Sequence, residues 1–381
     1  MSDLDLRFPA LSDLRARARR RLPRVSFEYL DSATGTEAGA RRNRERLDAV
    51  RFMPAILSGE MKPDLQVRFA GVDYALPVGI APVGMSGMIW PGAEATLARF
   101  AAERRIPYGL STVAAADPEE VGPIAGEMGW FQLYPPADPE IRRDMLERAK
   151  AAGFATLVMT VDVPGESRRE RQRRANISMP PKITAGMLLD MMRRPVWTAG
   201  MARRGMPRMR LPESYVTDAM RSSDAFVHAG RVIRGYPDWD YLAAVREEWD
   251  GPFAVKGVMD PDDAVRLRDA GVDILWVSNH SARQFEAGPA PIDQLPLVRE
   301  AVGPDAAIVY DSGIASGLDV LRALARGADF TMTGRSFHYA LAALGERGLA
   351  HWLHVLEADM RANMAQIGAR SLSDLEGRLV P

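Results

Sequence analysis

The 381-residue sequence predicts an α/β protein, a (β/α)8 TIM barrel preceded by a helical segment. Eight short and nearly continuous apolar runs alternate with amphipathic stretches, as expected for parallel strands that are buried on both faces and joined by helices. The chain contains neither GxGxxG nor GxxxxGK, which argues against the phosphate loops of the competing doubly wound folds. Polar residues follow nearly every apolar run, at the end of the strand where a barrel carries its active site.

The expected strands follow one another at regular intervals, with one long gap. They cover residues 75–83, 106–112, 130–135, 155–164, 253–258, 274–279, 306–313 and 330–336. Between them, helical periodicity with an N-terminal Asp or Ser and a closing glycine marks 138–153, 260–271 and 316–328. Right-handed crossovers through such helices close parallel strands into a barrel.

Two segments lie outside the eight repeating units. Residues 1–70 are mostly helical and charged, and we expect them to pack on a barrel domain that spans 71–381. Residues 177–235 interrupt the unit between the fourth and fifth strands, and their central part, 187–210, is rich in Met and Arg. We interpret this insertion as a loop over the C-terminal face, because the loops that follow barrel strands grow there.

The bulk composition excludes several classes of protein. The 49 basic and 50 acidic residues nearly cancel, which argues against nucleic acid as the main partner. The absence of cysteine excludes disulfides, Cys-ligated zinc and thiol catalysis. His351 and His354 lie three residues apart beside Glu357, but this segment reads as the last barrel helix, so we expect no metal site. Without a signal-peptide pattern or a spanning apolar run, a cytoplasmic location is favoured.

The strand ends bring polar and ionisable side chains to one rim. Burying such groups separately would be costly, so their convergence on one pocket is the simpler interpretation. Lys256 is the strongest single signal, because a lysine inside an apolar strand is rarely buried without an anionic partner. A lone histidine at a strand end is more often structural, but Asp162 can face His280 across the barrel, and Arg283 follows it in the sequence.

Several segments resemble the FMN-dependent α-hydroxy-acid oxidases and dehydrogenases, which include glycolate oxidase, L-lactate dehydrogenase and mandelate dehydrogenase. The stretch "SNHSARQ" (278–284) is similar to the family signature S-N-H-G-[GA]-R-Q. The blocks "APVGMSG", "WFQLY", "TVDVP", "VKG" and "DSGIASG" resemble family blocks in the same order, over roughly residues 20–375. The resemblance implies FMN as the cofactor and a small 2-hydroxy acid, L-lactate- or mandelate-like, as the substrate.

The resemblance also implies a cofactor site. Lys256 would lie near the flavin N1 and O2 and stabilise the negative charge of the reduced form. The remaining contacts would come from two sets of residues: near the ring Ala81, Pro82, Val83, Ser111, Gln132, Thr160 and Ser278, and around the phosphate Asp311, Ser312, Gly313, Gly334 and Arg335.

The same resemblance assigns the chemistry. His280 would be the base, and Asp162 would stabilise the imidazolium that forms. Arg169 and Arg283 would clamp the substrate carboxylate through the fork geometry of their guanidinium groups. The substrate pocket would be completed by Tyr29 and Tyr134.

Two positions depart from the family pattern, and a third bears on whether the protein is an oxidase or a dehydrogenase. Ala315 stands where the phosphate loop usually carries arginine, so we expect weaker FMN retention unless Arg335 or another basic residue compensates. Ser281 replaces the glycine beside the catalytic histidine, where a side chain can narrow the site. Gly84 stands where several oxidases carry alanine, which favours a dehydrogenase that reacts poorly with oxygen.

Several features of the function stay open at this point. The electron acceptor is a quinone, a carrier protein or oxygen. Segment 187–210 resembles the part by which mandelate dehydrogenase meets membranes, and the alternatives are a flexible lid or a subunit contact. The family resemblance implies a homotetramer. Competing functions are an FMN oxidoreductase for a bulky or peptide-derived substrate, and a catalytically silent flavin-binding protein.

Overall fold

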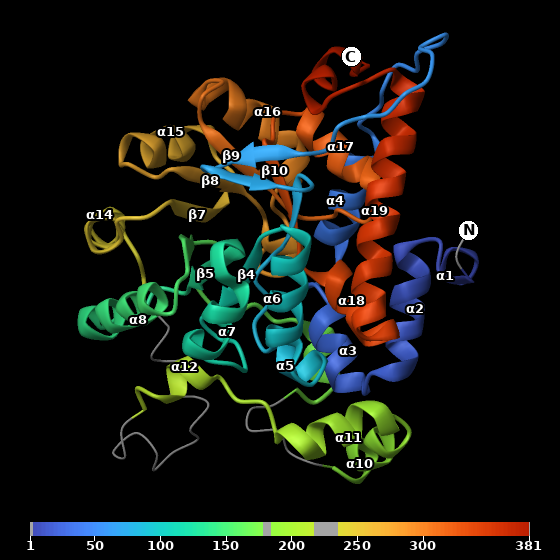
Figure 1. Cartoon of the computed structure of the whole chain (residues 1–381). Coiled ribbons are helices and arrows are strands. Elements are labelled where there is room, and N and C mark those ends of the chain that lie inside the picture. Colours follow the sequence, from blue (N-terminus) through green and yellow to red (C-terminus); the bar gives the residue numbers. More distant parts are fainter. Residues whose placement is uncertain (1–2, 178–183, 217–234, 381) are drawn as a thin grey trace.

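A closed barrel of eight parallel strands forms the centre of the molecule, in a computed structural model that describes residues 3–177, 184–216 and 235–380 (Figure 1). Strand β3 pairs with β4, and the order continues to β10, which pairs back with β3. The predicted fold class is therefore confirmed. The strands are β3 (Val78–Ile80), β4 (Tyr108–Ser111), β5 (Gly129–Leu133), β6 (Thr156–Thr160), β7 (Phe253–Val258), β8 (Ile274–Val277), β9 (Ala307–Tyr310) and β10 (Phe330–Thr333).

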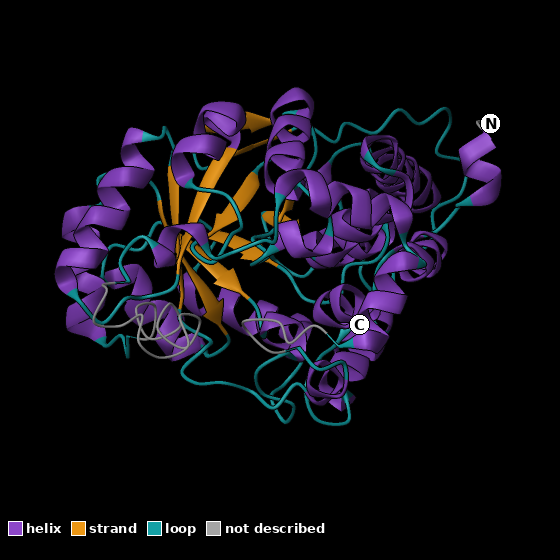
Figure 2. Ribbon diagram, turned by 90° about the horizontal axis from the view of Figure 1, so that it is seen from below, coloured by secondary structure: helices purple, strands orange, loops and turns teal. Residues whose placement is uncertain are grey.

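Helices surround the barrel, as Figure 2 shows for a view along it. Their starts follow from local sequence, because Asp138, Asp260 and Ser316 each accept hydrogen bonds from backbone N–H groups of the first helical turn. The helices are α6 (Ala93–Arg104), α7 (Pro118–Ala125), α8 (Pro139–Ala151), α14 (Trp239–Glu248), α15 (Pro261–Asp269), α16 (Pro291–Val302), α17 (Gly317–Ala325), α18 (Arg335–Leu344) and α19 (Glu346–Ile367).

An antiparallel hairpin of β1 (Val67–Phe69) and β2 (Val72–Tyr74) adds to the core inside the barrel. The ring of Phe330 packs between the two strands, with its centroid 5.2 Å from that of Phe69 and 5.1 Å from that of Tyr74. The sequence did not predict this hairpin, because three-residue strands give too little alternation to be recognised.

Four helices precede the hairpin and cover one side of the barrel: α1 (Asp3–Arg7), α2 (Leu11–Arg21), α3 (Arg24–Asp31) and α4 (Ala38–Asp48). Helix α2 lies beside α18, which follows the last strand (Figure 1). Because α3 and α4 supply residues to the cavity described below, this N-terminal segment forms part of the site wall.

The segment after β6 first forms the short helix α9 (Glu170–Arg174), and the described part of the insertion 177–235 then forms α10 (Ala185–Met192), α11 (Pro195–Arg204) and α12 (Arg210–Glu213). In Figure 1, α10 and α11 lie below α3 and α5 (Ser86–Ile89). The indole Nε1 of Trp197 donates to the carbonyl of Ile89 at 3.1 Å, and Nε of Arg194 donates to that of Leu22 at 3.1 Å. Within the described ranges, no helix is long and apolar enough to cross a membrane.

Candidate active site

One large cavity of about 1720 Å³ lies at the C-terminal ends of the barrel strands. Ligand cavities for single drug-sized molecules measure roughly 300–1,000 Å³, so this one has room for a tricyclic ring and a small substrate beside it. Most of the predicted site residues line it: Tyr29, Ala81, Pro82, Val83, Gln132, Tyr134, Thr160, Arg169, Lys256, His280, Arg283, Asp311, Ser312, Gly313, Gly334 and Arg335. Ser111, Asp162 and Ser278 lie directly behind this lining, bonded to Gln132, His280 and Lys256.

His280 and Asp162 form a hydrogen-bonded pair. Nδ1 of His280 donates to Oδ1 of Asp162 at 2.8 Å, because an ionised carboxylate can only accept. Burial lowers the pKa of His280 further than Asp162 raises it, and nearby Lys256 and Arg169 add to the lowering. Burial raises the pKa of Asp162, but His280 and Lys256 outweigh it, so the net shift is downward. The pair therefore rests as a carboxylate and a neutral imidazole whose Nε2 can accept a proton.

The barrel encloses the ammonium group of Lys256 among oxygen atoms. Its Nζ donates to Oγ of Ser278 at 2.8 Å and lies 3.3 Å from Oδ2 of Asp311 and 3.7 Å from Oδ2 of Asp162. Burial alone would lower the pKa of Lys256, but the two carboxylates raise it above its usual value. The lysine inside the apolar strand β7 thus has the anionic partners that its burial requires, and it stays charged.

The turn that carries His280 is strained. His280, Ser281 and Ala282 have φ values of 55°, 53° and 54°, in the left-handed region that costs a side-chain-bearing residue about 1–2 kcal/mol. Two hydroxyls hold this backbone: Ser278 accepts from the His280 N–H and Ser312 accepts from the Ser281 N–H, both at 3.0 Å. Ser281 therefore adopts the conformation that explains a glycine at this place in the family pattern.

A second conformational requirement falls on Gly257, within β7. Its φ is 113°, and a Cβ at this position would lie 2.6 Å from Cβ of Asp162. A side chain here would displace the partner of His280, so glycine is needed for the geometry of the pair.

Two arginines and two tyrosines form the opposite wall. The guanidinium of Arg283 donates to the carbonyls of Tyr29, Leu30 and Ser32 at the end of α3. Burial, together with repulsion from Arg169 and Arg335, lowers the pKa of Arg283 to about 9. This wall therefore carries positive charge that an anion would stabilise.

The tyrosine hydroxyls are neutral donors. Burial and the nearby carboxylate of Asp162 raise the pKa of Tyr134 to about 12. The hydroxyl of Tyr29 donates to the carbonyl of Gly84 at 2.9 Å. Both groups therefore keep their protons at neutral pH. The proton of Tyr29 is used by Gly84, whereas that of Tyr134 can be donated to an oxygen of a bound acid.

The residues of the barrel wall fit a flavin ring. Gln132 is buried, its Oε1 accepts from Ser111 at 2.6 Å, and its Nε2 has no hydrogen-bond partner within the described part of the chain. An unpaired buried amide donor is costly, so a ligand with acceptor atoms is expected to bind there. A flavin ring presents such acceptors, and Lys256 supplies a cation for the negative charge that reduction adds.

The far end of the cavity suits a phosphate. Arg335 begins α18, where backbone N–H groups and the helix dipole favour anions. Arg44 also lines this end, but its five N–H donors already serve Asp48, Asp319 and the carbonyl of Gly313. Arg44 therefore orders the loop from Gly313 to Ala315 and is not a direct replacement for the arginine that Ala315 lacks.

The contacts of two further residues near the site were not predicted from the sequence. Oε1 of Gln284 accepts from Arg169 at 2.7 Å and so holds one of the two predicted substrate arginines. His338 is buried between the carbonyl of Gly334 and the hydroxyl of Ser86, at 2.8 Å from each, and thus joins Gly334 to α5. Gln284 ends the signature "SNHSARQ" and His338 lies in no quoted motif, but neither position reveals these partners before the chain is folded.

Comparison with known proteins agrees with this geometry. A sequence model of the FMN-dependent dehydrogenase family matches residues 18–381. The L-lactate dehydrogenases of Pseudomonas aeruginosa (strain LESB58) and Pectobacterium atrosepticum are each 38% identical over 367 residues, covering 96% of this chain and 96% and 95% of theirs.

Solved structures show the same relationship. The monotopic membrane protein (S)-mandelate dehydrogenase superposes with a TM-score of 0.91 at 31% identity, covering 97% of this chain and 98% of its own. A mandelate oxidase gives a TM-score of 0.80 at 30% identity, with 98% of both chains covered. With a match over nearly its whole length and a cavity whose donors suit a flavin, this chain belongs to the family of FMN-dependent dehydrogenases.

Proposed function

We propose that this protein oxidises the hydroxyl group of a small (S)-2-hydroxy acid, L-lactate- or mandelate-like, to the 2-oxo acid. The observation that carries the proposal is the imidazole of His280, held by Asp162 at 2.8 Å, in the same cavity as two arginines that form no ion pair within the described part of the chain. A base and a carboxylate-binding wall are the two parts that this reaction requires from the protein.

The roles of the side chains follow from their charges. Arg169 and Arg283 bind the substrate carboxylate, and the hydroxyl of Tyr134 donates to one of its oxygens. Tyr29, whose proton bonds the carbonyl of Gly84, borders the same pocket. Nε2 of His280 takes a proton from the substrate, and the carboxylate of Asp162 stabilises the imidazolium that results. Bound FMN supplies the two-electron oxidising power. Lys256 would hold negative charge on the reduced ring.

A substrate panel tests the proposal. The purified protein should be yellow, and anaerobic addition of an (S)-2-hydroxy acid such as L-lactate or (S)-mandelate should bleach its absorbance. The (R) enantiomers serve as controls and should leave the absorbance unchanged. A yellow protein that no 2-hydroxy acid bleaches would contradict the proposed reaction.

The competing functions have less support. The relatives named above are dehydrogenases and oxidases of small hydroxy acids, which speaks against a peptide-derived substrate. A silent flavin-binding protein would have no use for the buried pair of His280 and Asp162, because burying such a pair is not in itself a source of stability.

We infer a dehydrogenase rather than an oxidase, so that a quinone or a carrier protein, and not oxygen, accepts the electrons. Gly84 supports this choice, because several oxidases of the family carry alanine at this place. In this chain a Cβ there would lie 2.5 Å from Cγ2 of Val113 and would push that side chain aside. Turnover with a dye acceptor should exceed oxygen consumption by far. If oxygen consumption in air were as fast as turnover with the dye acceptor, the protein would be an oxidase.

Ala315 should limit cofactor retention. Replacing it by arginine is expected to tighten FMN binding about 10- to 100-fold, because a charge-assisted hydrogen bond contributes about 1.5–3 kcal/mol. The dissociation constant is measured by the flavin fluorescence released on dilution. Ala315→Gln, which adds length without charge, is the control, and equal retention by both variants would show that charge is not the missing feature.

The insertion supports a peripheral contact with a membrane. Apolar side chains on and beside α10 and α11 are exposed, among them Met192 (68%) and Val196 (58%). Seven basic residues and one acid lie between Lys182 and Arg210, and such a basic surface favours anionic lipid. We infer a cytoplasmic protein that binds the inner face of the membrane through 187–210.

A homotetramer stays a prediction, which analytical ultracentrifugation can test.

Vesicle binding tests the membrane contact. The protein should sediment with anionic phospholipid vesicles, and the double substitution Met192→Ser with Val196→Ser should weaken this binding about 10-fold or more, since each buried apolar side chain contributes about 1.5–3 kcal/mol. Leu297→Ser on α16, another exposed apolar residue, is the matched control. Equal binding by all three proteins would favour a lid or a subunit contact instead.

A further inference from the structure

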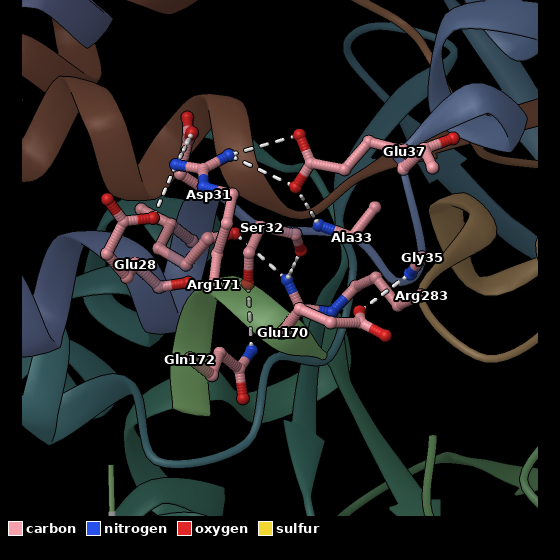
Figure 3. Close-up of polar contacts among 12 residues, drawn as sticks. Glu28, Asp31, Ser32, Ala33, Gly35, Glu37, Glu170, Arg171, Gln172 and Arg283 are labelled. Carbon is pink, nitrogen blue, oxygen red and sulfur yellow. Dashed lines mark hydrogen bonds and ion pairs between the residues drawn. The ribbon is translucent and has the colours of Figure 1, made fainter. Parts of the chain in front are cut away.

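Arg171, on the short helix α9, contacts three carboxylates of the segment from α3 to α4 (Figure 3). Its Nη2 lies 2.5 Å from Oε2 of Glu28 and 2.7 Å from Oδ2 of Asp31, and its Nη1 lies 3.1 Å from Oε1 of Glu37. The guanidinium thus bridges two elements that are more than 130 residues apart in the sequence.

These ion pairs are not ordinary surface pairs. The side chain of Asp31 is 2% exposed and that of Glu28 is 13% exposed. Asp31 also accepts hydrogen bonds from Arg15 and from the hydroxyl of Tyr339. Burial raises the pKa of Asp31, but hydrogen bonds from Arg15, Arg171 and Tyr339 outweigh it and lower the value to about 2. Asp31 is therefore charged at neutral pH, and its position is fixed by several partners.

The segment that Arg171 contacts also positions the substrate residues. Tyr29 lies on α3, and the last carbonyls of this helix hold the guanidinium of Arg283. Arg169 immediately precedes α9, and its backbone N–H donates to Oγ1 of Thr34 at 3.3 Å. The segment 28–37 thus holds three of the proposed substrate residues: Tyr29, Arg169 and Arg283.

Residues next to Arg171 add further contacts between α9 and the segment 28–37. Nε2 of Gln172 donates to Oγ of Ser32 at 3.1 Å, and Oε2 of Glu170 accepts from the N–H of Gly35 at 2.8 Å (Figure 3). Arg169 itself has a φ of 41°, a strained conformation that persists only when the flanking structure holds it. The contacts of α9 supply that support.

We propose that Arg171 is a positioning residue for substrate binding, which holds α9 on the segment 28–37 and so fixes Arg169 beside Arg283 on the same wall of the cavity. The inference rests on the proposed function, because it assigns these two arginines to the substrate carboxylate. The terminal nitrogens of Arg171 are already engaged by carboxylates, so Arg171 acts through Arg169 and not on the substrate.

Removing the charge of Arg171 would leave Glu28 and Glu37 without this cation, close to the positive wall of the cavity. Their negative charge would then attract Arg169 away from its place, and the strained backbone would relax. Arg171→Gln is therefore expected to weaken binding of oxalate, a carboxylate probe read by the flavin spectrum, about 10-fold or more. The Michaelis constant should rise by a similar factor.

Other measurements separate positioning from general support of the fold. The ratio of FMN to protein and the rate of flavin reduction at saturating substrate should stay within about three-fold of the wild type. Arg171→Lys keeps the charge but not the fork, so it should give an intermediate dissociation constant for oxalate. Glu28→Gln removes a single ion pair and should weaken oxalate binding by a smaller factor, which provides a test if Arg171→Gln does not fold.

The matched control is Arg142→Gln. Arg142 forms a similarly buried pair with Glu248, between α8 and α14, with Nη2 2.7 Å from Oε1. The substitution Arg142→Gln should lower the melting temperature without changing the dissociation constant for oxalate. Unchanged oxalate binding in either Arg171→Gln or Glu28→Gln would overturn the inference. A wild-type protein that binds no carboxylate probe would overturn the proposed function together with it.

Discussion

Replacing His280 by alanine is expected to slow flavin reduction by saturating substrate about 10²- to 10⁴-fold, the usual contribution of a positioned base. The imidazole is neutral, its Nδ1 is fixed by Asp162, and its Nε2 is left as the acceptor. The variant should remain yellow, because the phosphate end and Gln132 are untouched. Anaerobic stopped-flow spectroscopy measures the reduction rate directly.

Asp162→Asn is the comparison for this prediction. An amide can donate to Nδ1 and so favour the wrong tautomer of His280, and it offers no charge to the imidazolium. A large loss of rate is therefore expected in this variant as well. Reduction of His280→Ala at the wild-type rate would show that another group takes the proton.

The pH dependence should agree with the same assignment. The folded-state pKa of His280 is lowered, so the base is unprotonated at neutral pH and becomes protonated only as the pH falls through that lowered value. The acid limb of kcat/KM should therefore lie below about pH 6.5, the ordinary value for histidine. An acid limb above this value would mean that Asp162 outweighs burial and the nearby cations.

The sequence predicted the barrel because each buried strand is a short apolar run, and it predicted the residues at the cavity because strand ends meet at one face. Lys256 was recognised for a physical reason, its burial in β7, whereas the roles of Arg169 and Arg283 came from the family resemblance. The role of Arg171 could not be predicted. It depends on carboxylates of a distant helix, and its short-range pattern of charges resembles any solvated surface.

Replacing Lys256 by methionine should produce the largest loss of stability among these variants. The substitution keeps the length of the side chain but leaves the buried carboxylates of Asp162 and Asp311 without their cation. Breaking a buried ion pair by removing one partner costs about 3–5 kcal/mol. Urea unfolding of the protein should therefore shift to a much lower midpoint. Bound FMN should also be released, because in the proposed site Lys256 would donate to the flavin ring.

A double variant distinguishes the charge from the packing of Lys256. Adding Asp311→Asn to Lys256→Met removes one uncompensated carboxylate, so it should recover part of the lost stability, even though each change alone destabilises the protein. Recovery is expected because Asp311 also accepts from Ser278 and Ser312, and an asparagine oxygen can still accept from these hydroxyls. If the double variant is no more stable than Lys256→Met, unpaired negative charge on Asp311 is not the source of the loss. The lysine would then stabilise the barrel through its contact with Asp162 and through the cation–π contact of Nζ with the ring of Trp276, whose centroid lies 5.5 Å away.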